Sequence, residues 1–370
     1  MKKANRWLIV FYGIYLLVLV LVIGIVIYID PYLHYHAPQT DRFYYDLNSA
    51  NERDINDGLA KHTTFNGVIV GTSMTENFQA STAEELFGGV CAKLPYSGGT
   101  LRETCILLET ALESQPDLRW AIRSLDMNIL LKCPGTLRSD LGGFPPYLYS
   151  LNPFNDVYYL LNRDVVYKQC YTMLRNSAQG ITDYDSYAYW NDWYTFGSES
   201  VLQDRTFFEL ASEQRGLTEE ERVILRENIS TYVLSLAEKY PHVEFYYFFT
   251  PYSAAWWGSL LENGIFPRQL EALKLTAEMI LPYKNVHLFS WNNVAELTMD
   301  LNNYKDPGHY ASWVNDWMLR QMAVDSGRLT EENLEDHFQK TKELYERFDY
   351  VSLFDQTPLR KGEIPDFFRN

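Results

Sequence analysis

Apolar and polar positions follow three different patterns along the chain. One apolar run fills most of the first 29 residues, and beyond residue 63 short apolar runs alternate with stretches of helical periodicity. Between residues 131 and 240 neither pattern holds, because aromatic, charged and proline residues are mixed there. These changes predict an N-terminal tip and anchor (1–29), a juxtamembrane segment (30–63), an α/β domain (64–329) with an insertion at about 131–240, and a C-terminal helix and tail (330–370).

The N-terminal apolar run, residues 7–28, contains 22 residues and no charge. A helix of that length spans about 33 Å, which is enough to cross the hydrocarbon core of a bilayer. The run is longer than the apolar core of a signal peptide, and no A-x-A cleavage pattern follows it. Because Lys2, Lys3 and Arg6 precede the run, we expect one membrane crossing with a cytoplasmic N-terminus and an extracellular C-terminal domain. A cleaved secretory signal is the alternative.

Short apolar runs predict five strands, and the periodic stretches between them predict helices. The strands are expected at 67–70, 90–94, 120–125, 243–249 and 286–289, with helices at 83–87, after the capping box of Thr100 and Glu103, at 268–280 and after Ser312. Strands that alternate with helices imply a mostly parallel sheet with right-handed crossovers. The predicted fold class is therefore α/β, a flavodoxin-like three-layer α/β/α domain with a five-stranded sheet.

The insertion begins directly after the third predicted strand. It is aromatic and amphipathic at first, and a loop rich in Tyr, Trp and Asp follows at 183–196. We expect this helical, aromatic-rich segment to form a cap over the end of the sheet, with residues 145–159 and 184–194 lining the cleft; a separate small domain is the alternative. The stretch 330–349 predicts one surface helix with Thr330 as its N-cap.

Charge and cysteine content exclude several classes of protein. The chain has 32 basic and 48 acidic residues, a net charge of −16, so it is a poor candidate for binding nucleic acid. Its four cysteines include no C-x-x-C pair, which argues against a zinc ribbon or a redox motif. Free thiols are expected, although an extracellular site would permit two disulfides. Phosphate-loop, dinucleotide and zincin motifs are absent from the sequence.

A candidate nucleophile follows the first predicted strand of the domain. Ser73 lies two residues after Gly71, on a turn at the carboxyl end of a buried strand. That edge is where ligands bind in open α/β sheets. The lipase elbow G-x-S-x-G is not matched, since Thr75 occupies its last position, and a purely structural turn is the simpler interpretation of this segment alone.

A candidate base and its orienting acid follow the fifth predicted strand. Asp306 and His309 lie three residues apart in a Pro-Gly loop, which can direct both side chains into one cleft. Oxyanion donors are expected from Gly98 and Gly99 after the second strand and from Asn128 after the third. All these residues lie beyond carboxyl ends of strands in one predicted sheet, and this shared placement predicts a Ser-His-Asp site.

The constellation resembles the SGNH/GDSL hydrolase superfamily. In that family a G-D-S block carries the nucleophile, a Gly follows strand two, an Asn follows strand three and a D-x-x-H block lies near the C-terminus. Ser73 matches the nucleophile, and Asp306 and His309 match the last block. The chain departs from the family at Thr72, where Asp is usual, and after strand three, where it has Leu-Asp-Met-Asn in place of G-x-N-D; either Asp126 or Asn128 could hold that place.

The resemblance implies an activity. With a single anchor and an outward-facing domain, the chain is similar to the branch that acts in bacterial cell-envelope acylation, which includes the D-alanyl transfer protein of lipoteichoic acid synthesis and alginate O-acetylation proteins. It implies a serine esterase or O-acyltransferase that acts on an envelope polysaccharide or its acyl donor, works beside a membrane-bound O-acyltransferase and needs no metal or organic cofactor. The alternative is a catalytically weak partner that binds such an acyltransferase or an acyl carrier.

Aromatic side chains are the candidate substrate contacts. Trp190 and Trp193 lie in the insertion, and Tyr252 follows the fourth strand. Aromatic faces stack on sugar rings, although packing in the core or the cap is the more common role of such residues. The pattern leaves open which glycan and which acyl group are used, and whether water or a sugar is the acceptor.

Overall fold

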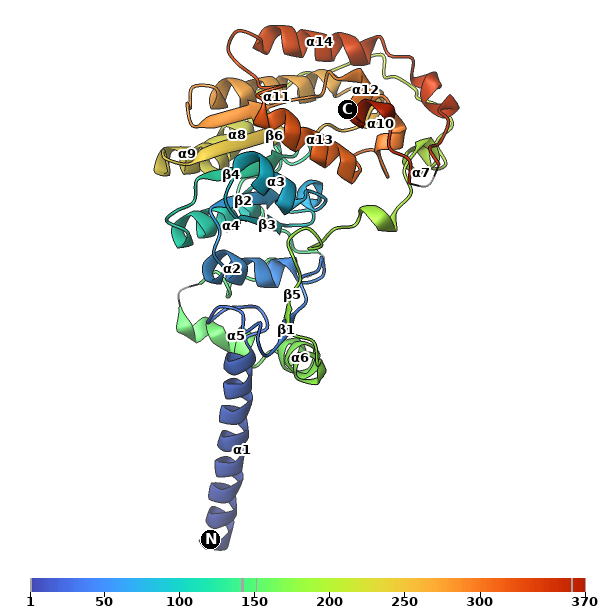
Figure 1. Ribbon diagram of the computed structural model, residues 1–370. Coiled ribbons are helices and arrows are strands. Elements are labelled where there is room, and N and C mark those ends of the chain that lie inside the picture. The colour runs from blue at the N-terminus through green and yellow to red at the C-terminus, as the bar shows by residue number, and fades with distance from the viewer. Residues whose placement is uncertain (1, 141–142, 151, 361, 370) are drawn as a thin grey trace. The chain divides into compact units, whose positions relative to one another are not determined.

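Figure 1 shows the chain in a computed structural model, which describes residues 2–140, 143–150, 152–360 and 362–369. The contacts divide the chain into two units. The larger comprises Thr64–Leu141 and Tyr184–Asn370, and the smaller comprises Met1–Thr63 and Gly142–Asp183. The long insertion is therefore divided between the two units, near residue 183.

The larger unit is built on a parallel sheet of five strands, which confirms the predicted α/β class. The strands are β2 (Gly67–Gly71), β3 (Cys91–Pro95), β4 (Trp120–Leu125), β6 (Glu244–Phe249) and β7 (Val286–Phe289). Their order is β3-β2-β4-β6-β7, and every neighbouring pair is parallel. This is the flavodoxin-like order, whose ligand site lies at the carboxyl ends of the first and third strands, here β2 and β4.

Helices cover the sheet in two groups. All residues of β2, β3 and β4 are buried, as expected for parallel strands with both faces covered. The helix α3 (Ala80–Phe87) packs on α13 (Ser312–Ala323), while α4 (Leu101–Ser114) packs on the π-helical turn Ser230–Leu234 between α8 (Glu219–Ile229) and α9 (Ser235–Lys239). The predicted capping box of α4 is present, with Thr100 and Glu103 bonded to each other's backbone N–H.

The remaining helices complete the second group. Helix α11 (Phe266–Ile280) contacts α8, α10 (Ala254–Glu262) and α14 (Leu334–Glu346). The predicted N-cap of α14 was wrong: the helix begins after Asn333, because Thr330 and Asn333 first form a reciprocally bonded turn. The unit also contains α7 (Ser198–Leu202), α12 (Ala295–Thr298) and short 3-10 turns at Ser73–Thr75, Asn191–Trp193, Leu301–Asn303, Tyr350–Asp355 and Asp366–Phe368.

The smaller unit joins the N-terminal segment to the first part of the insertion. It contains α1 (Lys2–Ile29), α2 (Glu52–His62), a 3-10 turn (Pro153–Asp156), α5 (Val157–Leu160), a π-helical turn (Val165–Cys170) and α6 (Tyr171–Arg175). Two-residue strands β1 (Tyr44–Tyr45) and β5 (Gly180–Ile181) pair in parallel. The buried Asp30 connects the parts, since its carboxylate accepts bonds from the Tyr159 hydroxyl at 2.8 Å and from three backbone N–H groups of residues 34–36.

Helix α1 has the length and composition of a membrane-spanning helix. Within its segment Asn5–Ile29, the most apolar 18-residue window has a mean hydropathy of 3.0, and 6% of that window is buried in the protein. A signal sequence shares these features. Most of the large apolar side chains of α1 are therefore left uncovered by the chain itself.

Candidate active site

The candidate nucleophile sits on the turn that ends β2. Thr72 is extended and caps the 3-10 turn Ser73–Thr75, with its hydroxyl accepting from the Met74 N–H. Gly71 is required at the end of the strand, because a β-carbon there would lie 2.4 Å from the Ser124 hydroxyl and 2.5 Å from Thr75. The turn therefore presents the half-buried Ser73 at the carboxyl edge of the sheet.

The loop of Asp306 and His309 is held by its own backbone and by the end of β6. The Asp306 carboxylate accepts the N–H groups of Gly308 and His309, both at 2.9 Å. The loop closes through a bridge between Tyr304 and Tyr310. The Ser253 hydroxyl, beyond β6, donates to the Pro307 carbonyl at 2.8 Å.

These two loops bring three predicted residues together. The Ser73 Oγ lies 2.8 Å from the His309 Nε2, and the His309 Nδ1 lies 2.8 Å from the Asp306 Oδ2. With its proton on Nδ1, the imidazole donates to Asp306 and accepts from the Ser73 hydroxyl. Burial raises the pKa of Asp306, but the bonds from His309 and the Gly308 N–H outweigh this and hold the pKa below its usual value. Asp306 therefore stays ionised beside the ring.

The predicted oxyanion donors differ in availability. Gly98 has a positive φ of 59°, which favours glycine, and its N–H makes no hydrogen bond to the described residues. The Gly99 N–H, in contrast, already donates to the Tyr96 carbonyl at 2.7 Å. Asn128 is exposed. The amides of Gly98 and Ser73, the latter at the start of a helical turn, are the better backbone candidates.

Asp126, two residues before Asn128, has a different environment. Asp126 is 4% exposed, and its Oδ2 accepts from the Thr72 hydroxyl, while its Oδ1 has no hydrogen-bond partner in the described part of the chain. Burial raises the pKa of Asp126, although Thr72 and the nearby Ser124 hydroxyl oppose this. Thr72 and Asp126 together connect the ends of β2 and β4 directly behind Ser73.

A cleft of about 580 Å³ opens over these residues. All of its walls belong to the larger unit. It is lined mostly by polar side chains: Thr72, Ser73, Met74, Gly98, Gly99, Thr100, Asp126, Asn128, Ile129, Lys132, Thr136, Leu137, Arg138, Ser139, Asp140, Tyr252, Trp256, Asp306, Gly308 and His309. Sequence reasoning missed Arg138 and Lys132, since nothing in the local pattern relates these positions to the strand ends.

The three aromatic candidates have different positions. Tyr252 is buried in the cleft wall against Gly308. Trp190 is also buried, but it packs edge-on against the His309 ring, with centroids 5.9 Å apart, and does not line the cleft. Trp193 is 70% exposed and outside the cleft lining. Residues 145–150 and 152–159 belong to the smaller unit, so their predicted contact with the cleft stays a prediction.

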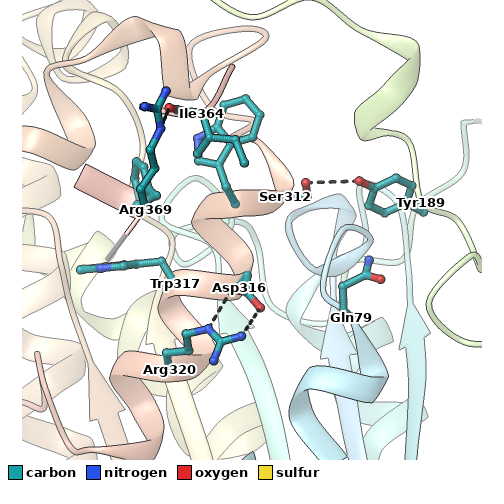
Figure 2. A pocket seen from close by; sticks show the side chains of 10 residues that line it. Gln79, Tyr189, Ser312, Asp316, Trp317, Arg320, Ile364 and Arg369 are labelled. Carbon is teal, nitrogen blue, oxygen red and sulfur yellow. Dashed lines mark hydrogen bonds and ion pairs between the residues drawn. The ribbon is translucent and has the colours of Figure 1, made fainter. Parts of the chain in front are cut away.

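A second pocket, of about 480 Å³, lies along α13 and the C-terminal tail. Figure 2 shows two pairs among its polar groups: Asp316 with Arg320, and the Tyr189 hydroxyl with Ser312. No pair of nucleophile and base lines it. Elsewhere in the described part of the chain, no three His, Cys, Asp or Glu side chains gather as metal ligands, and the four cysteines are free thiols.

Comparison with known proteins adds little to this geometry. No protein-family profile matches the chain, and no curated protein matches it. Its fold is similar to a solved structure described as "a putative platelet activating factor from Streptococcus pneumonia", with a TM-score of 0.37 and 12% sequence identity, over 79% of this chain and 92% of that one. A likeness at this level carries no argument about activity.

Proposed function

We propose that this protein is a serine esterase or O-acyltransferase of SGNH type with Ser73 as its nucleophile. The observation that carries the proposal is the continuous contact from Ser73 through His309 to Asp306, at 2.8 Å on each side of the ring, on the wall of an open cleft. A hydroxyl hydrogen-bonded to an imidazole that is itself oriented by a carboxylate is the arrangement that activates serine for acyl transfer.

The chemistry proceeds in two halves. The Ser73 oxygen attacks the acyl carbonyl while His309 Nε2 takes the hydroxyl proton, and the N–H groups of Ser73 and Gly98, with the Asn128 side chain, stabilise the resulting oxyanion. As the intermediate collapses, His309 returns the proton to the departing alcohol and an acyl-serine remains. Water or a sugar hydroxyl then gives its proton to His309 and attacks the acyl group, and His309 returns this proton to the Ser73 oxygen as the acyl–serine bond breaks. Asp306 keeps the imidazole in the required tautomer throughout.

The substrate proposal rests on the cleft and on α1. The cleft wall is mostly hydroxyl, amide and charged side chains, which suits a polar substrate better than a lipid chain. We propose that α1 anchors the protein in a membrane, with the basic N-terminal residues inside and the enzyme domain outside. The substrate would then be an ester of a cell-envelope polysaccharide or its acyl donor, delivered in cooperation with a membrane-bound O-acyltransferase.

The test is labelling and turnover with the full-length protein in detergent. A fluorophosphonate probe should label Ser73, and p-nitrophenyl acetate should be hydrolysed. Ser73→Ala should lose both properties, while Ser352→Ala, an exposed serine on a 3-10 turn away from the cleft, should keep them. Unchanged ester turnover in Ser73→Ala would reject nucleophilic catalysis and favour the alternative, a partner that binds an acyltransferase or acyl carrier.

A further inference from the structure

One cation lies directly against the proposed oxyanion amide. The guanidinium of Arg138 covers Gly98 so closely that a β-carbon on this glycine would be 1.4 Å from Nη1. Arg138 also lines the cleft together with Ser73 and His309. A charged group therefore lies beside the site where the acyl carbonyl would bind, in the space that the missing side chain of Gly98 leaves open.

Arg138 is fixed by several hydrogen bonds, but these do not use all of its N–H donors. Its Nε and Nη2 donate to the two oxygens of Asp140 at 2.7 and 3.1 Å, and its Nη1 donates to the Ser97 carbonyl at 3.2 Å. The backbone N–H of Arg138 is fixed by Glu103 at 2.9 Å. A guanidinium has five N–H groups. Three are used, which leaves one N–H on each terminal nitrogen for a ligand.

Two cations and three carboxylates line the cleft, so the local charge balance depends on how far each carboxylate is already paired. Lys132 is a second cation on the wall, exposed and without an ion pair in the described part of the chain. Two of the acidic side chains that line the cleft are hydrogen-bonded to other residues: Asp306 to the His309 ring, and Asp126 to the Thr72 hydroxyl. Two carboxylates contact Arg138: Asp140, which is 69% exposed so that solvent screens its charge, and Glu103, which accepts the Arg138 backbone N–H at 2.9 Å.

We propose that Arg138 forms an anion subsite beside the acyl-transfer centre, and that the substrate carries a carboxylate or phosphate group near its ester. The position of the ester in this inference rests on the proposed function, whereas the anion subsite does not. Two N–H groups on the terminal nitrogens of one guanidinium match two oxygens of such an anion, which lysine cannot do.

The competing interpretation is that Arg138 only ties its loop to Ser97. A tie of that kind would leave both remaining N–H groups solvated, and replacing Arg138 would alter stability without altering anion affinity. The two interpretations therefore differ in a binding measurement that does not depend on turnover.

The test uses full-length Ser73→Ala protein in detergent, titrated calorimetrically with sodium phosphate and, separately, sodium acetate. Adding Arg138→Gln should weaken binding of at least one anion about 10-fold or more. The anion affinity with Arg138→Lys should lie between that of Ser73→Ala alone and that with Arg138→Gln, since lysine keeps the charge but lacks the paired N–H groups. Arg320→Gln is the matched control, because Arg320 is also paired with an aspartate, Asp316, but outside the cleft. Its affinity should not change.

The outcomes separate the possibilities. Weaker binding of phosphate alone indicates a phosphate-bearing substrate, and weaker binding of acetate alone indicates a carboxylate. Affinities within twofold of each other across all the variants would overturn the subsite. If Arg138→Gln does not fold, the Arg138→Lys result decides. Failure of the proposed function would be seen separately, as ester turnover that persists in Ser73→Ala while the anion titrations remain interpretable.

Discussion

Two neighbouring side chains fix the orientation of the His309 ring. Asp306 binds Nδ1 from one side, and Trp190 packs edge-on against the ring. Trp190 is fixed in turn by the Asn77 Oδ1, which accepts the Trp190 backbone N–H at 3.1 Å, and by the Lys305 ammonium, which lies 3.9 Å from the centre of the indole. If His309 is the base, as proposed, these ring contacts give Trp190 a positioning role, which differs from the direct substrate contact that its sequence context suggests.

Asp306→Asn should reduce kcat/KM for a p-nitrophenyl ester about 10³-fold or more while the protein stays folded. The amide can donate to Nδ1, which stabilises the tautomer with its proton on Nε2, where it cannot accept from Ser73. Steady-state kinetics with thermal unfolding as a check measures this effect. Asp316→Asn, an acid on α13 outside the cleft, is the control, and activity of Asp306→Asn within fivefold of wild type would contradict the assigned role.

Trp190→Ala should lower kcat on a small ester about 10-fold or more, with little change in KM, because the ring loses support rather than a substrate contact. Trp190→Phe should restore much of the activity, since a phenyl edge can still meet the imidazole. Steady-state kinetics on p-nitrophenyl acetate measures kcat and KM separately. Trp193→Ala, with its exposed ring, should behave as wild type, and a rise in KM alone for Trp190→Ala would favour the substrate-contact interpretation.

Helix α14 fastens the C-terminal part of the chain to the second group of helices. Tyr345 stacks on Trp257 of α10 with centroids 4.6 Å apart, and its hydroxyl donates to the Asn292 carbonyl at 2.7 Å. On the same helix, His337 is buried and lies 2.9 Å from the Ser290 hydroxyl. Burial lowers the pKa of His337 to about 4 from its ordinary value of 6.5. The folded chain therefore keeps this imidazole neutral.

Acidification should destabilise the fold through His337. Well above pH 6.5 His337 is neutral in both the folded and the unfolded chain, and the free energy of unfolding is not reduced by its titration. As the pH falls toward 4, only the unfolded form takes up a proton, which lowers the free energy of unfolding. Between pH 7.5 and 5 the loss should be about 2 kcal/mol, and it should be absent in His337→Gln. Urea unfolding followed by tryptophan fluorescence at both pH values checks this, with exposed His242→Gln as the control. Equal pH dependence in wild type and His337→Gln would refute it.

The chain as a whole combines an uncovered apolar helix with a strongly acidic remainder. The large side chains of α1 are mostly exposed, and its segment carries three basic and no acidic residues, whereas the rest of the chain has 29 basic and 48 acidic residues, a charge of −19. An uncovered apolar helix is stable in a bilayer and not in water, because its backbone is satisfied internally and its side chains avoid water only there.

A reporter that is active only in the cytoplasm should therefore be silent when it is fused to the C-terminus, and active when it is fused to the N-terminus. The protein should also remain in the membrane fraction after carbonate extraction, which a cleaved signal sequence would not allow. Strong C-terminal reporter activity would contradict the orientation. Release by carbonate at a mass lower by the first segment would contradict the anchor.

Local pattern was sufficient for the sheet and for the order of its strands along the chain. The predicted runs at β2, β4 and β7 matched the observed strands within one residue, because buried parallel strands are rich in apolar residues and end at turn residues. The two-residue strands β1 and β5 had no such pattern, since their pairing depends on a contact between segments more than 130 residues apart.

The candidate site, like the sheet, has features that the sequence predicted and others that depend on the tertiary structure. Chain order and strand ends were enough to place Ser73, Asp306 and His309 at one edge of the sheet, because parallel strands direct their carboxyl ends to the same side. Only the tertiary structure decided that the Gly99 N–H is bonded while the Gly98 N–H makes no hydrogen bond to the described residues, that Trp190 packs against the imidazole, and that Arg138 returns across 41 residues to lie beside Ser97. These choices depend on loop conformations and side-chain directions, which are set by long-range packing and leave no periodic trace in the sequence.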